Sequence, residues 1–143
     1  QAAVEAAALL GVWGVASVLD LCQTEALLNE LVPRLADVNV VKVGVGLTML
    51  AAAQRARADG VTLLLSGLGS EELFAGYARH QSAQNLDRDC LSGLLSMYHR
   101  DLQRDYAAAR LAGVRIRYPF LHWPVVQHAL GLPKRLQADP LAT

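Results

Sequence analysis

The chain is poor in cysteine, and this shortage excludes two kinds of small protein. Its two cysteines, Cys22 and Cys90, are too few for a disulfide framework or a cysteine-rich metal cluster. Neither has a cysteine or histidine at the spacing of zinc ligands, and the four histidines are scattered through the second half of the chain. The sequence therefore predicts two buried thiols and no metal site built from cysteine or histidine.

Net charge is also missing, because thirteen basic and thirteen acidic residues cancel. Without a positive field, a nucleic-acid partner is not expected. The longest apolar run, Ala6 to Leu19, is shorter than the roughly 20 residues that span a bilayer, and no basic leader with a cleavage site opens the sequence. We expect a soluble protein of the cytoplasm or of an organelle interior, neither secreted nor inserted into a membrane.

The first half of the chain predicts helices around one buried strand. Residues 1–10 are alanine-rich and favour a helix. Residues 12–19 form an apolar, valine-containing run, which is typical of a strand buried on both faces. A helix capped by Thr24 and interrupted at Pro33 follows, and residues 43–58 predict another helix.

A second strand is predicted at residues 61–66, where "VTLLLS" is a short apolar run. Two strands separated by roughly forty helical residues make a crossover unit, which favours a parallel sheet with right-handed connections. After Leu86 the leucines recur at helical spacing, so only helices are expected there. The predicted fold class is α/β, with an α/β part in residues 1–80 and a helical part in residues 81–143.

The stretch "SGLGSEE", residues 66–72, lies where the second predicted strand ends. Ligands of parallel sheets bind beyond that end, glycines let the backbone approach an anion, and Ser70 can cap a helix whose free N–H groups face the ligand. A phosphate beside Glu71 or Glu72 would be repelled unless a divalent cation lay between them, so Mg²⁺ on a polyphosphate is expected. The alternative is structural, because a helix dipole favours acids in its first turn and glycines often form a simple turn.

Two blocks of the sequence resemble one family. "SGLGSEELFAGYARH", residues 66–80, is similar to the motif Ser-Gly-x-Gly-x-Asp-Glu-Leu/Ile-Phe-x-Gly-Tyr of asparagine synthetases and their relatives. "DLQRDYAAARLAGVRIRYPFLHWPVVQHALGLP", residues 101–133, is similar to a later family segment in which Asn-Leu-x-Arg-Asp-Asp leads to Gly-x-Glu-x-Arg-x-Pro-Phe-Leu-Asp and Leu-Pro. The order and separation of the blocks also fit. The asparagine-synthetase-domain-containing proteins share "AGY" followed by a small residue, Arg and His.

The resemblance implies an ATP-pyrophosphatase fold, a Rossmann-like parallel sheet of the adenine nucleotide alpha hydrolase-like type followed by a helical subdomain. It also implies a reaction in which ATP adenylates a substrate carboxylate with loss of pyrophosphate, after which ammonia displaces AMP. The implied nucleotide-binding residues are Ser66, Gly67, Leu68 and Gly69. The implied catalytic residues are Glu71, Glu72 and Asp105, with Glu71 as a ligand of Mg²⁺. Arg104, Arg115 and Arg117 match the second block, the last two as surface charges or ion pairs.

Several residues depart from the family pattern. Leu68 stands where glutamine-hydrolysing members carry a glutamate that can accept a proton, and Glu71 replaces an aspartate. Tyr106 and Ala107 replace Asp-Arg, and His122 replaces the last residue of Pro-Phe-Leu-Asp. The Ser-Gly-Gly-x-Asp-Ser loop that grips pyrophosphate, the downstream lysine and an amino-terminal cysteine for glutamine hydrolysis do not occur in the sequence.

These departures leave two interpretations. The chain is either the carboxyl-terminal two-thirds of an ATP-dependent amide-forming domain whose loop lies elsewhere, or a degenerate relative that keeps the fold as a scaffold or interaction surface. The 143 residues alone are expected neither to hydrolyse ATP to AMP nor to bind it tightly. An unpaired apolar edge on the strand at residues 12–19 predicts a partner, either another protein chain, a missing amino-terminal segment or a second copy.

Overall fold

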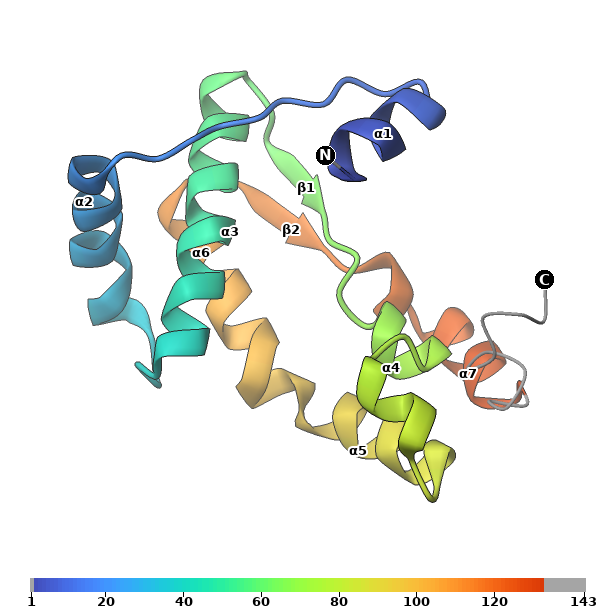
Figure 1. The fold of residues 1–143 in the computed structure, drawn as a ribbon. Helices are drawn as coiled ribbons and strands as arrows, with labels where there is room; N and C mark the ends of the chain where they lie inside the picture. The colour runs from blue at the N-terminus through green and yellow to red at the C-terminus, as the bar shows by residue number, and fades with distance from the viewer. Residues whose placement is uncertain (1, 133–143) are drawn as a thin grey trace.

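The computed structural model describes residues 2–132 as a mainly helical chain with a small parallel sheet (Figure 1). The helices are α1 (Ala2–Leu9), α2 (Leu21–Leu31), α3 (Val40–Ala58), α4 (Ser70–Phe74), α5 (Leu86–Met97), α6 (Gln103–Leu111) and α7 (Trp123–Leu130). The strands are β1 (Leu63–Leu65) and β2 (Arg115–Arg117). Short 3₁₀ turns cover Val32–Arg34, Ala78–Ser82 and Pro119–Leu121, and a π-helical turn covers Tyr98–Leu102. The presence of both helices and a parallel sheet confirms the predicted α/β class.

Side-chain caps set the start of both α2 and α3. Asp20 Oδ1 accepts a hydrogen bond from the Gln23 backbone N–H at 2.8 Å, and Gln23 Oε1 accepts one from Asp20 N–H at 3.0 Å. The predicted cap at Thr24 is therefore wrong, since its hydroxyl donates to the Asp20 carbonyl at 2.7 Å from inside the helix. Asn39 Oδ1 accepts from Lys42 N–H at 2.9 Å, so α3 starts three residues earlier than predicted.

The buried strand predicted at residues 12–19 does not form. This segment runs from α1 to α2 without helix or strand, and all of it is exposed (Figure 1). Trp13, for example, is 98% exposed. A strand is held by hydrogen bonds to a neighbour, and in residues 2–132 the only paired strands are β1 and β2. Apolar, β-branched residues alone cannot supply those bonds.

The strand predicted at residues 61–66 forms at its centre as β1, but its partner was not predicted. Leu63 pairs with Arg115 and Leu65 with Arg117 in parallel register. The sheet is parallel as predicted, but the predicted pairing with residues 12–19 is wrong, because β1 pairs with β2 instead. β2 also corrects the expectation of helices alone after Leu86. β1 is also less buried than predicted, because Leu63 is 41% and Leu65 71% exposed.

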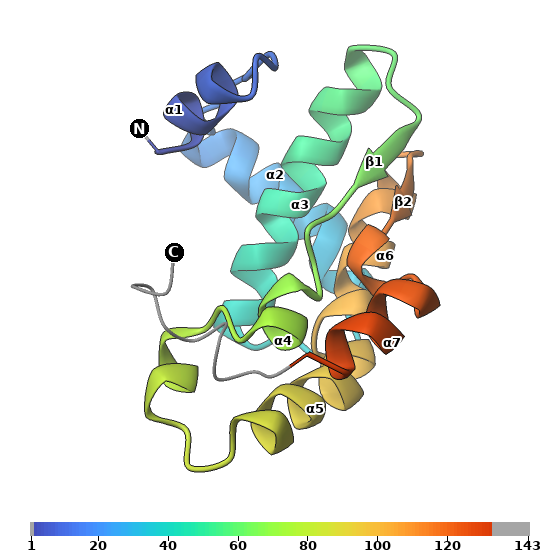
Figure 2. The ribbon, with the colours of Figure 1, turned by 90° about the vertical axis from the view of Figure 1, so that its right-hand side faces the viewer.

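The buried core lies where α2, α3 and α6 stack and reach the sheet (Figure 2). One cluster joins these helices through Leu27, Leu31, Leu50 and Ala108. A second joins α3 and α6 to β2 through Ala53, Ala109, Val114 and Ile116. A third joins α4 to α7 through Leu73, Val126 and Ala129. The turn between β1 and α4 therefore connects two packed regions, which fixes its position.

The cysteines differ from each other in burial. Cys90 is buried in α5 as predicted, whereas Cys22 is exposed in α2, so the prediction of two buried thiols is wrong for Cys22. Among the helices of residues 2–132, none combines the length and apolarity that crossing a membrane requires.

Candidate functional site

The turn after β1 is organised by its own polar groups. Ser66 continues the sheet, since its N–H donates to the Arg117 carbonyl at 2.9 Å. Its hydroxyl oxygen accepts from Leu68 N–H at 3.2 Å, and Ser70 N–H donates to the Gly67 carbonyl at 3.2 Å. Residues 66–70 thus form a compact turn directly beyond the carboxyl end of β1, where the sequence predicted a ligand site.

Gly69 is the one position of this turn that demands glycine. Its φ of +101° lies in the left-handed region, and a Cβ there would be 2.5 Å from Leu121 Cδ2. Gly69 also occupies the N-cap position of α4, so the predicted cap at Ser70 is wrong. The Ser70 hydroxyl instead donates to Glu71 Oε2 at 2.8 Å. Because α4 is only five residues long, its dipole contributes little to ligand binding.

The two neighbouring glutamates have opposite surroundings. Glu71 lines an open cleft. Glu72 is buried, with 1% exposure, and its Oε1 accepts from the Tyr77 hydroxyl at 2.8 Å and from Arg100 Nη2. Within the described chain its Oε2 has no hydrogen-bond partner. Glu72 is therefore bound within the protein interior, whereas Glu71 faces the cleft.

Charged residues enter the site from the π-helical turn between α5 and α6 and from the first turn of α6. Arg100 Nε donates to Asp101 Oδ2 at 2.6 Å, and Arg104 Nη1 donates to Asp101 Oδ1 at 3.1 Å. Arg104 also binds Asp105 Oδ1, at 2.8 Å from Nε and 2.7 Å from Nη2. With Glu72 at one end, these residues form a continuous chain of alternating acids and bases. A π turn within a helix is frequently found at functional sites.

These elements enclose a cleft of about 590 Å³. The predicted residues in its lining are Ser66, Gly67, Leu68, Glu71 and Asp105. The other polar residues in its lining include Lys42, Tyr77, Arg100, Asp101 and Arg104. Gly69 and Glu72, also predicted, lie next to the cleft and are not part of its lining. The three basic and three acidic side chains of the lining cancel in charge.

Burial and pairing shift several pKa values in this cluster. Burial, followed by the hydrogen bond to Glu72, raises the pKa of Tyr77 to about 12. Burial raises the pKa of the Asp105 carboxyl against the opposing effect of Arg104. Burial lowers the pKa of Arg100, but the bonds to Asp101 and Glu72 outweigh it, so the net shift is upward. Tyr77 is thus a hydrogen-bond donor at neutral pH, and Asp105 takes up a proton more readily than an ordinary aspartate.

The donor set of the cleft fits Mg²⁺ only together with a phosphate ligand. In residues 2–132, no group of three or more His, Cys, Asp or Glu side chains could hold a metal ion by itself. Mg²⁺ commonly takes one or two carboxylates and completes its shell with water and substrate phosphates. Asp101 and Asp105 are paired with arginines, whereas Glu71 has no basic partner in the described chain. Glu71 is the carboxylate best placed to share Mg²⁺ with a polyphosphate.

Four polar residues of the cleft were not predicted from the sequence, namely Lys42, Tyr77, Arg100 and Asp101. One signal was available, because the dipeptide Arg-Asp occurs at residues 100–101 and again four residues later, which places like residues on one helical face. Lys42 carried no such signal. Its Nζ binds Asp37 at 2.8 Å and the His99 carbonyl at 3.2 Å, a contact that only the folded chain creates.

Arg115 and Arg117 lie outside this cluster. Both are exposed on β2, and neither forms an ion pair in residues 2–132. Of their two predicted roles, the surface charge is therefore the one that the described chain supports.

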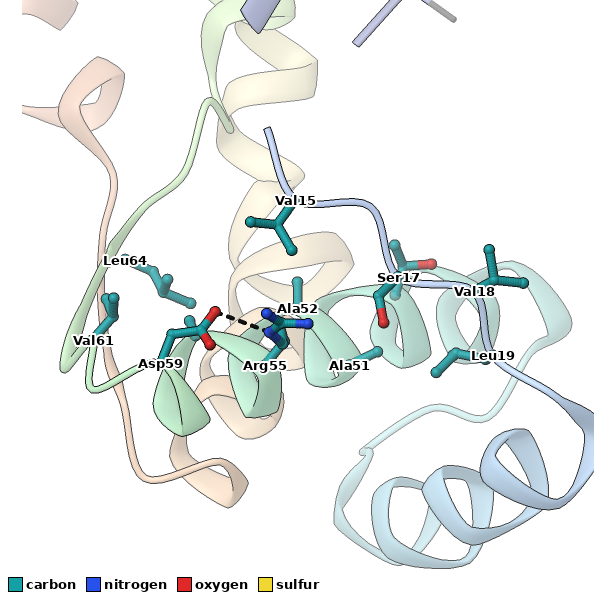
Figure 3. A pocket seen from close by; sticks show the side chains of 12 residues that line it. Val15, Ser17, Val18, Leu19, Ala51, Ala52, Arg55, Asp59, Val61 and Leu64 are labelled. Carbon is teal, nitrogen blue, oxygen red and sulfur yellow. Dashed lines mark hydrogen bonds and ion pairs between the residues drawn. The ribbon is translucent and has the colours of Figure 1, made fainter. Parts of the chain in front are cut away.

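A second, apolar hollow of about 760 Å³ lies between residues 15–19, α3 and β1 (Figure 3). Val15 of the segment at residues 12–19 faces α3 across it, and Leu64 of β1 lies at its end. Its one ion pair among the lining residues joins Arg55 to Asp59 at 2.9 Å. This hollow offers little for chemistry, in contrast to the polar cleft.

The chain is similar to known proteins over a range that includes the turn after β1. The family model for asparagine synthase matches residues 6–91. A protein of Methanocaldococcus jannaschii, named "Putative asparagine synthetase (glutamine-hydrolyzing) 1", is 35% identical over 74% of the chain and 21% of its own length. Asparagine synthetase B of Escherichia coli is 35% identical over 48% of the chain and 13% of its length. An asparagine synthetase domain-containing protein of Saccharomyces cerevisiae is 35% identical over 46% of the chain and 13% of its length. The chain thus spans about a fifth or less of these relatives.

Proposed function

The chain belongs to the asparagine synthase family, and from this premise we propose that it forms the polyphosphate-binding part of an ATP-dependent, amide-forming ligase. In the proposed reaction a substrate carboxylate attacks the α-phosphorus of ATP, pyrophosphate leaves, and ammonia or another amine then displaces AMP from the acyl carbon. The observation that supports this is the cleft in which the turn of residues 66–71 meets the charged residues 100–105. The fold proposed for the whole sheet is that of the ATP pyrophosphatases.

The turn after β1 is proposed to hold the phosphates. Ser66, Gly67 and Leu68 line the cleft, and nothing lies within 4 Å of the place where a Cβ of Gly67 would be, so the backbone there is open to a ligand. Glu71 would share Mg²⁺ with the phosphate oxygens. The ion would neutralise charge on the departing pyrophosphate, since the charged side chains of the lining carry no net positive charge.

Asp105 is proposed as the base of the amide-forming step. Leu68 occupies the cleft position at which a carboxylate would otherwise be available and cannot accept a proton. The Asp105 carboxyl lines the same cleft, burial raises its pKa, and Arg104 engages only its Oδ1. Its Oδ2 could therefore take the proton that the attacking nitrogen releases.

Formation of AMP and pyrophosphate from ATP tests this function. We would assay the complete natural protein with Mg²⁺-ATP, an ammonia source and L-aspartate as the first carboxylate probe. The proposal expects AMP and pyrophosphate in equal amounts, and Asp105→Asn should slow amide formation at least tenfold. The control Asp87→Asn, at an exposed position of α5, should leave the rate unchanged. Production of ADP and phosphate would overturn the proposal.

A second candidate function is a scaffold that keeps the fold without the chemistry. Leu68 and the longer side chain of Glu71 favour it, as does a cleft whose charges are already paired among themselves. It predicts that the complete natural protein is folded but shows neither ATP binding nor AMP formation with any carboxylate. The same assay therefore distinguishes the two functions.

We also propose that a partner strand, from another chain or a second copy, covers the open edge of β1. Hydrogen bonds from Ser66 N–H to the Arg117 carbonyl and from Arg115 N–H to the Thr62 carbonyl show that alternate residues of this segment face β2. The main-chain groups of Leu63 and Leu65 therefore point to the other edge. Val61 and Leu64 of the same segment line the apolar hollow (Figure 3). Cytoplasm or an organelle interior is the compartment proposed for this protein.

A further inference from the structure

Three basic side chains line the polar cleft, and they differ in their exposure and in the partners that they already bind within the protein. Lys42 is bound to Asp37 and to a backbone carbonyl, and its side chain is 19% exposed. Arg104 is bound to Asp101 and Asp105 and is 8% exposed. Arg100 is the most accessible, with 34% of its side chain exposed. It is therefore the cation that a ligand in the cleft can reach most easily.

Arg100 is held from two sides. Its Nε donates to Asp101 on its own helix, and its Nη2 donates to Glu72 on α4. In residues 2–132 its Nη1 has no hydrogen-bond partner. A guanidinium is planar, so fixing Nε and Nη2 also fixes the direction of Nη1. The remaining donor thus has a fixed direction on a residue that lines the cleft, and it loses little entropy when a ligand binds.

Glu72 is the anchor of this arrangement. Its carboxylate is buried, it receives the Tyr77 hydroxyl at 2.8 Å as well as Arg100, and it is adjacent to Glu71 on α4. The ion pair therefore links α4 with the π-helical turn through two residues that are 28 positions apart in sequence. A buried acid without its cation would be costly, so Glu72 favours the position in which Arg100 faces the cleft.

We infer that Arg100 binds a phosphate group of the ligand directly through Nη1, and that Glu72 acts as a positioning residue that holds Arg100 there. The ligand class is a Mg²⁺-bound polyphosphate, ATP or the released pyrophosphate. This inference rests on the proposed function, since it assigns a further binding residue to the same site. It gives Glu72 a role through Arg100 and leaves Glu71 as the acid that meets Mg²⁺.

The test measures binding of Mg²⁺-pyrophosphate and Mg²⁺-ATP to the complete natural protein by calorimetry. Hydrogen bonds to charged groups are strong enough that Arg100→Gln should weaken binding of both probes about ten- to a hundredfold. Arg100→Lys should recover part of that loss, because lysine restores the positive charge but lacks the planar guanidinium with its fixed donor directions. The matched control is Arg110→Gln, at an exposed position on α6, which should bind as the unchanged protein does.

A double-mutant cycle tests the positioning role. Glu72→Gln should weaken binding about three- to tenfold in the unchanged protein and have almost no effect once Arg100→Gln is present. The double variant removes both charges together, so no unpaired charge is left inside the protein. It should therefore stay folded and measurable even if the unpaired Glu72 destabilises the single variant Arg100→Gln. Circular dichroism at each step confirms the fold.

The outcomes separate the two proposals. If the unchanged protein binds neither probe, the proposed function is overturned, and this inference fails with it. If the unchanged protein binds both probes and the folded Arg100→Gln variant, or the folded double variant, binds them equally well, only this inference is overturned. If Glu72→Gln weakens binding equally with and without Arg100, Glu72 does not act through Arg100 and the positioning role is wrong.

Discussion

A Cβ placed on Gly69 would lie 2.5 Å from Cδ2 of Leu121. The turn after β1 and the 3₁₀ turn after β2 are therefore in direct contact, although they come from the two separate sequence blocks that resemble the family motifs. Substitution of this glycine is expected to damage both the local backbone and the packing.

Gly69→Ala should lower the free energy of unfolding by about 2 kcal/mol or more, from the cost of a left-handed non-glycine residue and from the clash with Leu121. The matched control is Gly67→Ala, where nothing lies within 4 Å of the added atom, and its cost should stay below about 1 kcal/mol. Urea unfolding of the two variants measures the difference. Equal losses at both positions would contradict the contact.

The helices of this chain could be predicted because their residues repeat with helical period and end at recognisable signals. Residues 43–58 and the leucines after Leu86 are of this kind. The error at residues 12–19 has a different origin. Strand formation depends on a neighbouring strand, and the sequence of one segment says nothing about whether that neighbour is present. β2 was missed because three residues, Arg115 to Arg117, are too few to show a period.

The candidate site could be predicted where a local motif carries it. Ser66, Gly67, Leu68 and Glu71 follow one another in the chain, and the structure places them along one cleft. The different surroundings of Glu71 and Glu72 could not be predicted, because only tertiary packing decides which face of a short helix is buried. The cations of the cleft also depend on packing between distant segments, Lys42 on α3 and Arg100 on the π-helical turn.

Glu71→Gln should therefore change Mg²⁺-dependent ATP binding, whereas Glu72→Gln should change the stability of the fold. Glu71→Gln should leave the free energy of unfolding within about 0.5 kcal/mol of its original value, as for a surface substitution. It should also raise the Mg²⁺ concentration required for ATP binding several-fold. Glu72→Gln should cost about 1 to 3 kcal/mol of stability, because it weakens hydrogen bonds to Tyr77 and Arg100 inside the protein. Thermal unfolding and a Mg²⁺ titration of ATP binding measure the two effects, and identical behaviour of the two variants would contradict their assignment.

Two half-buried tyrosines, Tyr77 and Tyr118, predict how stability changes at high pH. Burial, then the hydrogen bond to Glu72, raises the pKa of Tyr77 to about 12, and burial, then Asp105, raises that of Tyr118 to about 12, from an ordinary value of 10.0. The folded state holds these protons more tightly than the unfolded state. The resulting stabilisation is complete below pH 10 and is lost as the pH rises from 10 toward 12.

Absorbance of tyrosinate near 295 nm follows this titration directly. Two of the four tyrosines should ionise near pH 12, and Tyr77→Phe and Tyr118→Phe should each remove part of that step. Glu72→Gln should move the Tyr77 component toward pH 10, because the carboxylate charge disfavours the phenolate. An unchanged titration in Glu72→Gln would contradict the coupling between these two residues.

The exposed edge of β1 predicts self-association of the isolated chain. Leu65 is 71% exposed on an edge whose main-chain groups are open, and the neighbouring hollow is apolar. Lysine on an edge strand blocks pairing because its charge would have to be desolvated. Leu65→Lys should therefore reduce the concentration-dependent increase in sedimentation coefficient.

The control is Leu95→Lys on α5. Leu95 is also an exposed leucine, with 75% exposure, and it lies away from the strand edge. If only Leu65→Lys gives a monomer, the strand edge is the interface. If both substitutions act alike, general surface hydrophobicity accounts for the association. If the chain is already a monomer before any substitution, the proposal that a second copy covers the edge of β1 is wrong.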